Sequence, residues 1–67
     1  MTAAQFERLA PSEAEALLCA RFRALAACGC PPDDALVLAS RVDVDVCGAI
    51  SLLRRGCPPA LVPALLT

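Results

Sequence analysis

The chain has 67 residues, of which 58% are hydrophobic and 14 are alanine, and six arginines face seven carboxylates for a net charge of −1. This length allows one small domain with a marginal core, which excludes a two-domain enzyme. His, Trp and Tyr are absent, which excludes a histidine triad, a histidine metal site and an aromatic platform for single-stranded nucleic acid.

The first main helix is predicted from Ser12 to Cys28. Ser12 and Glu15 have the spacing of a capping box, in which each side chain bonds to the other residue's amide. The large apolar residues at helical spacing on one face are Leu18, Phe22 and Leu25. Gly29 ends the helix, because glycine adopts the left-handed conformation of a C-terminal cap at little cost.

Two shorter helices follow, each with its own start signal. The prolines at 31–32 and the two aspartates after them open the second helix, which runs to about Arg41. Asp45 is the expected N-cap of the third helix, and Gly56 ends it. The residues expected to face the core are Ala35, Leu38, Ala39, Val42, Val46, Ala49, Ile50 and Leu53. Residues 42–46 also alternate like a strand, but a single strand would have no partner here.

Residues 60–66 are interrupted by Pro63, so we expect a short, kinked or 3₁₀ helix there. Together the segments predict an all-α fold, a small three-helix bundle with a short extra C-terminal helix. We assign residues 12–67 to this single domain and residues 1–11 to an N-terminal segment that can form a short helix.

An internal repeat with a period of 27 residues links two of the predicted helix ends. Residues 25–32 (LAACGCPP) recur as residues 52–59 (LLRRGCPP). Each copy predicts the same helix corner: a glycine turns the chain, a cysteine packs inward as a small hydrophobic residue, and two prolines start the next helix. Two copies are too few for a solenoid.

The spacing of several residues resembles the ubiquitin-associated (UBA) family. They are Leu25, Gly29, Cys30, Ala35, Asp45, Val46, Ala49 and Leu53. In that family a helix ends in Met-Gly-aromatic, an alanine follows six residues after the glycine, and Asn or Asp caps a third helix that carries an alanine and a leucine. The N-terminal domain of bacterial elongation factor Ts shares this bundle, and its third helix also ends in Leu-Arg before a glycine, as residues 53–56 do here.

The resemblance covers residues 22–56 and implies a UBA-like bundle that binds another protein. Cys28 and Cys30 stand where the family has the Met and the aromatic residue of its ubiquitin-binding loop. The chain is rich in alanine, and all of its basic residues are arginine. This composition is typical of proteins encoded by GC-rich bacterial genomes, and such bacteria have no ubiquitin. The resemblance therefore implies the bundle and the habit of protein binding, with a partner other than ubiquitin.

Five cysteines, an odd number, without a visible signal peptide indicate reduced thiols in the cytoplasm. A zinc site could be assembled from four of the cysteines, Cys28, Cys30, Cys47 and Cys57, but structural zinc prefers ligands that come in pairs close together in the sequence. Cys47 and Cys57 are ten residues apart along a helix, or about 15 Å. We therefore expect no metal and no cofactor, and a structural zinc or thiol protein is kept as an alternative.

We do not expect an enzyme. The aspartate pairs at 33–34 and at 43 and 45 lie at predicted helix starts, where aspartate is a common cap. No histidine is present to activate a cysteine nucleophile. A second alternative is a DNA-binding regulator of the helix-turn-helix type, with the third helix as its recognition helix. The balanced charge argues against nucleic acid as a partner, because DNA-binding domains carry a basic surface.

The chain has more apolar residues than a three-helix core can bury, and this surplus indicates an interface. We expect a protein partner or a homo-oligomer and no membrane partner. The predicted function is a small non-enzymatic protein–protein interaction module, an adaptor or regulator of a larger protein. The predicted interaction surface comprises Cys28, Gly29, Cys30, Pro31, Pro32, Leu52 and Arg55 with the C-terminal residues Leu61, Val62 and Leu66.

Overall fold

The computed structural model describes residues 1–66, and within them the chain is helical and contains no strand, which confirms the predicted fold class. The elements are α1 (Ala3–Glu7), α2 (Pro11–Ala27), α3 (Pro32–Ser40), α4 (Val46–Arg54), a 3₁₀ helix η1 (Pro59–Leu61) and α5 (Val62–Leu66). No helix in residues 1–66 combines the length and the hydropathy that a membrane span requires.

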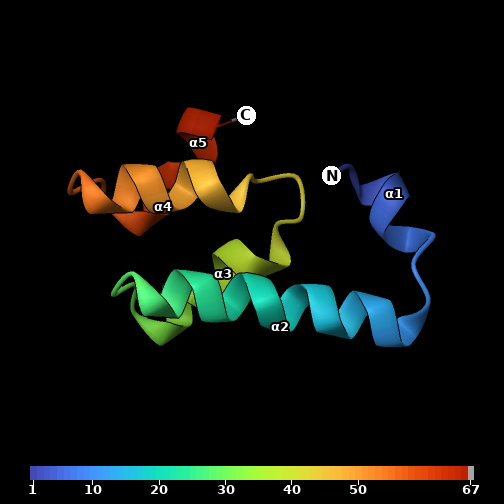
Figure 1. Cartoon of the computed structure of the whole chain (residues 1–67). Helices are drawn as coiled ribbons and strands as arrows, with labels where there is room; N and C mark the ends of the chain where they lie inside the picture. Colours follow the sequence, from blue (N-terminus) through green and yellow to red (C-terminus); the bar gives the residue numbers. More distant parts are fainter. Residues whose placement is uncertain (67) are drawn as a thin grey trace.

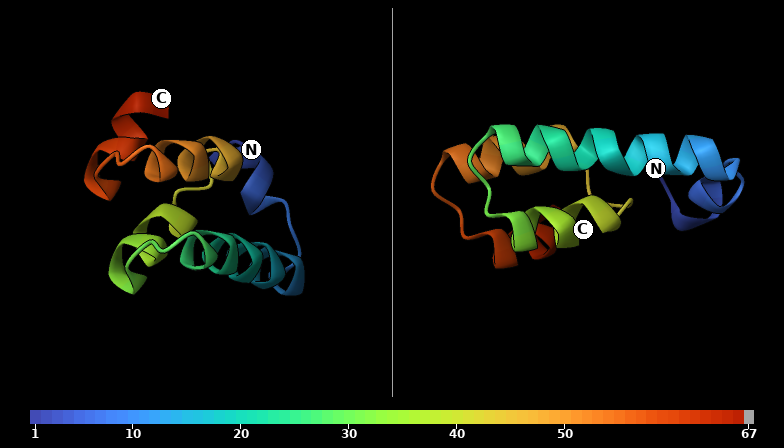
Figure 2. Two further views of the ribbon diagram at one scale, coloured as in Figure 1. Left: turned by 60° about the vertical axis from the view of Figure 1, so that its left-hand side comes forward. Right: turned by 90° about the horizontal axis from the view of Figure 1, so that it is seen from below.

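Of the three main helices, α2 and α4 run in the same direction (Figure 1). Helix α3, which lies between them in the sequence, runs in the opposite direction. Helix α2 packs against α3 and α4, α5 packs against α4, and η1 lies against α3. The turns that end α2 and α4 therefore lie at the same end of the molecule (Figures 1 and 2). The N-terminal part of α2 extends beyond α3 with α1 beside it, so the molecule is elongated, 35 × 22 × 17 Å.

The start of α2 differs from the prediction. The helix begins at Pro11, and the Ala10 amide donates a hydrogen bond of 3.1 Å to the Glu13 carboxylate. Proline is favoured at the first helical position, and this preference places the start one residue before Ser12. A capping box does occur in α1, where Thr2 and Gln5 bond each other's amides at 3.1 and 2.8 Å.

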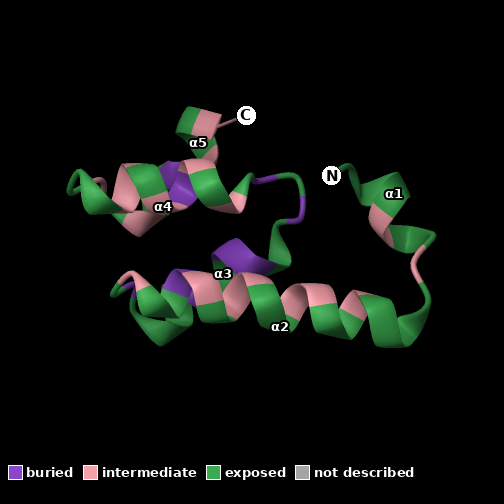
Figure 3. Cartoon of the chain, viewed as in Figure 1, coloured by how far each residue is buried: buried purple, intermediate pink, exposed green. Residues whose placement is uncertain are grey.

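Buried residues gather on α2, α3, α4 and the linker before α4, where these elements face one another (Figure 3). The largest fully buried side chains are Leu25, Leu38, Val44 and Val62. The expected core residues Ala35, Leu38, Ala39, Val42 and Ala49 are all buried. Val46, Ile50 and Leu53 are half-buried. In the linker before α4, Val42 and Val44 are buried, whereas the residues between and beside them are exposed. This alternation explains the strand-like pattern of residues 42–46.

Arg21 of α2 holds the end of α3 and the linker that follows it. Its Nε donates to the carbonyl of Ala39 at 3.0 Å, and its Nη2 donates to the carbonyls of Val44 at 2.8 Å and Leu38 at 3.3 Å. A further bond of 2.6 Å reaches the Arg41 carbonyl. A positive charge at a helix C-terminus also suits the helix dipole. Burial lowers the pKa of the Arg21 guanidinium, an effect that nearby carboxylates oppose, and the group stays charged at neutral pH.

Candidate functional site

The two copies of the sequence repeat form two helix corners with the same backbone. We call residues 28–32 the first corner and residues 55–59 the second corner. In the first, the Gly29 amide donates to the Ala26 carbonyl at 3.0 Å, and the amide of the next residue, Cys30, donates to Leu25 at 3.3 Å. This pair of bonds is a Schellman motif, with glycine in the left-handed conformation at φ 93°. The predicted glycine cap is therefore confirmed.

The second corner repeats this geometry at the end of α4. The Gly56 amide donates to Leu53 at 3.0 Å, the Cys57 amide donates to Leu52 at 3.1 Å, and Gly56 has φ 89°. A proline N-cap then starts the next helix at each corner, Pro31 with ψ 145° and Pro58 with ψ 136°. Because neither proline has an amide proton to leave unpaired, the chain restarts without an orphaned donor at that position.

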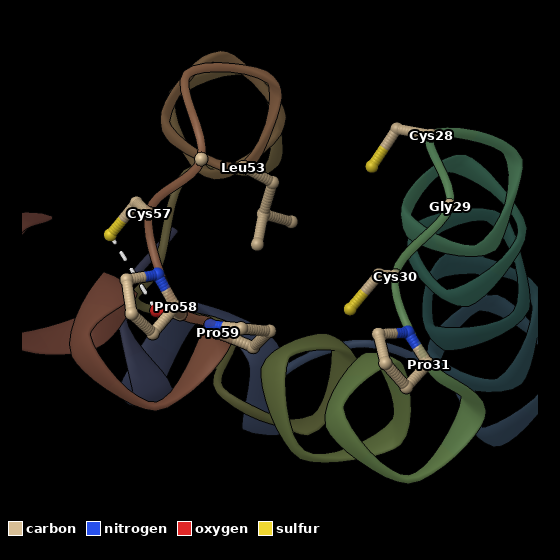
Figure 4. Close-up of a pocket in the computed structure, with 9 residues that line it drawn as sticks. Cys28, Gly29, Cys30, Pro31, Leu53, Cys57, Pro58 and Pro59 are labelled. Atoms are coloured by element: carbon tan, nitrogen blue, oxygen red, sulfur yellow. Dashed lines mark hydrogen bonds between the residues drawn. The ribbon is translucent and has the colours of Figure 1, made fainter.

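A cleft of about 260 Å³ separates the two corners (Figure 4). Its lining comes from both: Cys28, Gly29, Cys30 and Pro31 on one side, and Leu53, Gly56, Cys57, Pro58 and Pro59 on the other. We call this hollow the corner cleft. Its walls are proline rings, thiols, backbone and one leucine side chain, so it offers an apolar surface without an ionised group among the lining residues. Its volume suits one or two side chains of a partner, because pockets for drug-sized ligands begin at about 300 Å³.

The thiols at the two corners are placed differently. The sulfur atoms of Cys28 and Cys30 are turned toward the cleft, whereas that of Cys57 is turned away from it and donates to the Pro58 carbonyl at 3.5 Å (Figure 4). Cys28 also donates to the Leu25 carbonyl at 3.1 Å. Burial raises the pKa of the Cys30 thiol, and the negative charge of Asp34 and the neighbouring Cys28 add to the effect. Cys30 is therefore neutral at pH 7 and acts as an apolar part of the wall.

The structure brings together only part of the predicted interaction surface. Cys28, Gly29, Cys30 and Pro31 line the corner cleft, and the exposed Arg55 directly precedes the lining residue Gly56. The remaining predicted residues, Pro32, Leu52, Leu61, Val62 and Leu66, do not line it.

The inclusion of Val62 in the surface is wrong. Its side chain is 0% exposed, because η1 and α5 turn it into the core between α3 and α4. Leu52 and Leu66 are half-buried against the same core, whereas Leu61 is 54% exposed. The C-terminal segment therefore serves mainly to close the core, and the interaction surface shifts to the second corner.

The sequence reasoning missed the other side of the cleft, which is lined by Leu53 of α4 and by Gly56, Cys57, Pro58 and Pro59 of the second corner. The 27-residue repeat was the signal that could have found them, because it equates each of the last four with a residue of the first corner. What the repeat alone does not show is that the two corners face each other, which depends on α2 and α4 running in the same direction.

Metal-ligating side chains do not gather in threes anywhere in the described part of the chain, residues 1–66. Cys19 and Cys47 are exposed, and all five cysteines are free thiols. Comparison of the chain with protein-family models, with curated proteins and with solved structures gives no match in any of the three.

Proposed function

We propose that this chain is a small non-enzymatic protein–protein interaction module, which binds a segment of a larger protein at the corner cleft. The observation that carries the proposal is the cleft itself, an apolar hollow between two corners that are each closed by the same pair of backbone hydrogen bonds. Binding sites on rigid elements are favourable because little conformational entropy is lost when the partner docks.

The chemistry of the cleft indicates the kind of segment that it would take. Its size and its proline and thiol walls suit an apolar side chain. Arg55 is exposed beside the second corner, and within residues 1–66 it has no ion-pair partner. A carboxylate next to the apolar side chain would pair with it and steer the approach. The proposed ligand is therefore a peptide segment with an apolar anchor next to an acidic residue.

We also propose that the bundle is UBA-like and that the protein acts in the cytoplasm. Support for the first comes from the residues that carried the resemblance. Gly29 caps α2, Ala35 and Ala49 are buried between helices, and the Asp45 carboxylate caps α4 by accepting from the Gly48 amide at 2.9 Å. Support for the second comes from five free thiols, which suit a reducing compartment.

A peptide selection tests the proposed function. A displayed library of random peptides is selected against the immobilised, reduced protein, and the recovered peptides are measured against the variants Pro31→Glu and Pro58→Glu. Both prolines are exposed on the cleft and have no amide that the fold uses, so a glutamate there adds charge to the apolar wall and leaves the helices intact. We expect each variant to weaken binding by about tenfold or more, as loss of an interface anchor does.

Pro11→Glu is the matched control. Pro11 is also exposed at a helix start but lies on α2, outside the cleft. The proposal predicts that this variant binds the selected peptides as the unmodified protein does. Peptides that bind all three variants equally would refute the corner cleft as the site.

A further inference from the structure

A second hollow lies along α2 beside Leu36 of α3, and it shares no residue with the corner cleft. Its lining consists of Leu18, Cys19, Phe22 and Arg23 from α2 and Leu36 from α3. Leu36 is 61% exposed, and its neighbour Val37 is equally exposed. We call this region the α2 hollow. Two of the large apolar residues that remain exposed, Leu36 and Val37, therefore lie at or next to this hollow.

The molecule exposes more surface than its mass predicts. A compact monomer of 6.9 kDa exposes about 4,000 Å². This chain exposes 4377 Å². The N-terminal half of α2 accounts for part of the difference, because none of residues 11–20 is buried. Such a surplus on a small domain is commonly covered by a second chain.

Two residues of opposite charge lie on α2 at equal distances along the helix from Cys19, a lining residue of the α2 hollow. Glu15, Cys19 and Arg23 follow one another at intervals of four residues, so they lie along one side of α2. All three are exposed, and within residues 1–66 neither charged group has an ion-pair partner. Cys19 stands at the midpoint, with the carboxylate about 6 Å toward one end of the helix and the guanidinium about 6 Å toward the other.

We propose that two copies of this chain associate through their α2 hollows, with the two α2 helices antiparallel and Cys19 close to the two-fold axis. In this arrangement each Glu15 meets Arg23 of the second copy, which gives two symmetric ion pairs. A parallel arrangement would instead place Glu15 against Glu15 and is repulsive. The apolar side chains of Leu18, Phe22 and Leu36 form the centre of the interface.

The two-fold axis makes the contact self-complementary and closed, as isologous dimers require. The contact strip along 17 residues of α2 is only about 25 Å long. It therefore belongs to the small, weak class of interfaces, and the expected affinity is micromolar. The α2 hollow and the corner cleft have no lining residue in common, so this inference does not depend on the proposed function.

A charge exchange tests the proposal, with the dissociation constant of the dimer measured by sedimentation equilibrium under reducing conditions. Glu15→Arg and Arg23→Glu each turn two attractive pairs into two repulsive ones, and we expect each to weaken the dimer by about tenfold or more. The double variant restores opposite charges and should return the dissociation constant to that of the unmodified chain. Circular dichroism of each variant checks that the helices are intact.

Cys19 supplies a second readout that does not rely on charge. Diamide oxidises two thiols to a disulfide and takes up both electrons and both protons as it becomes a hydrazine. We expect a covalent dimer from the Cys47→Ser variant, in which Cys19 is retained, and none from Cys19→Ser, in which the other exposed thiol is retained. A monomer at millimolar concentration, single charge variants that dimerise normally, or cross-linking through Cys47 alone would each overturn the proposal.

Discussion

Replacement of Arg21 is the sharpest test of how this fold is held together. The guanidinium donates to the part-buried carbonyls of Leu38, Ala39 and Val44, at the end of α3 and in its linker, where the last carbonyls of a helix lack amides from a following turn. The Leu38 carbonyl also accepts from the Arg41 amide at 3.2 Å. A hydrogen bond to a charged group contributes about 1.5–3 kcal/mol, and partial solvent access reduces this to about 1 kcal/mol each. Arg21→Ala should therefore lower the free energy of unfolding by about 3 kcal/mol.

A loss of this size is large for a chain of 67 residues, whose total stability is about 3–10 kcal/mol. The melting temperature should fall by about 20 °C. Urea unfolding followed by circular dichroism measures the effect. Arg21→Lys should fall between the two proteins, because an ammonium keeps the charge but not the planar set of donors.

Arg54→Ala is the matched control, since Arg54 is an exposed arginine in the last turn of α4 whose side chain makes no hydrogen bond or ion pair within residues 1–66. This substitution should lower the free energy of unfolding by less than about 1 kcal/mol. If Arg21→Ala loses no more than this control, the bonds of Arg21 do not stabilise the fold, and the reasoning is refuted.

Three further predictions concern single positions. Cys19 should react with N-ethylmaleimide at pH 7 well before Cys30, because Cys30 is buried and its pKa is raised; equal rates by mass spectrometry would contradict this. Gly29→Ala should cost about 1–2 kcal/mol in urea unfolding through backbone strain alone, since φ is 93° and an added Cβ meets no atom within 4 Å. The hydrogen bond from Arg41 lowers the pKa of Asp43, so its contribution to stability is complete above the ordinary carboxyl pKa of about 3.9 and is lost as the pH falls through the lowered value. Asp43→Asn should therefore reduce the loss of stability between pH 5 and pH 2, and an unchanged acid transition would count against the pair.

Local signals predicted most of the helix boundaries. Gly29, Gly56 and Asp45 act through their own backbone conformation or through an amide three residues away, so their effect can be read from neighbouring residues alone. The start of α2 was misplaced because two local signals compete, and the proline at position 11 outweighs the capping box at Ser12.

The role of Arg21 could not be predicted in the same way. Its four acceptors lie 17 to 23 residues further along the chain, and they become available only once α3 has ended beside α2. The corner cleft has the same origin. The repeat predicts two similar corners, but their meeting depends on the packing of α2, α3 and α4. Likewise, the burial of Val62 follows from the turn between η1 and α5, which the sequence indicates only as a kink.

The most direct test of the central claim, that the corner cleft binds a protein segment, is an amide shift titration by ¹⁵N NMR of the reduced protein with a selected peptide. Among the amides that line the cleft, four lie at matching positions of the two corners and report on both sides: Gly29, Cys30, Gly56 and Cys57. The account predicts that the largest shifts fall on these four and saturate together. Shifts that are confined to the α2 hollow, or that leave both corners unchanged, would contradict it.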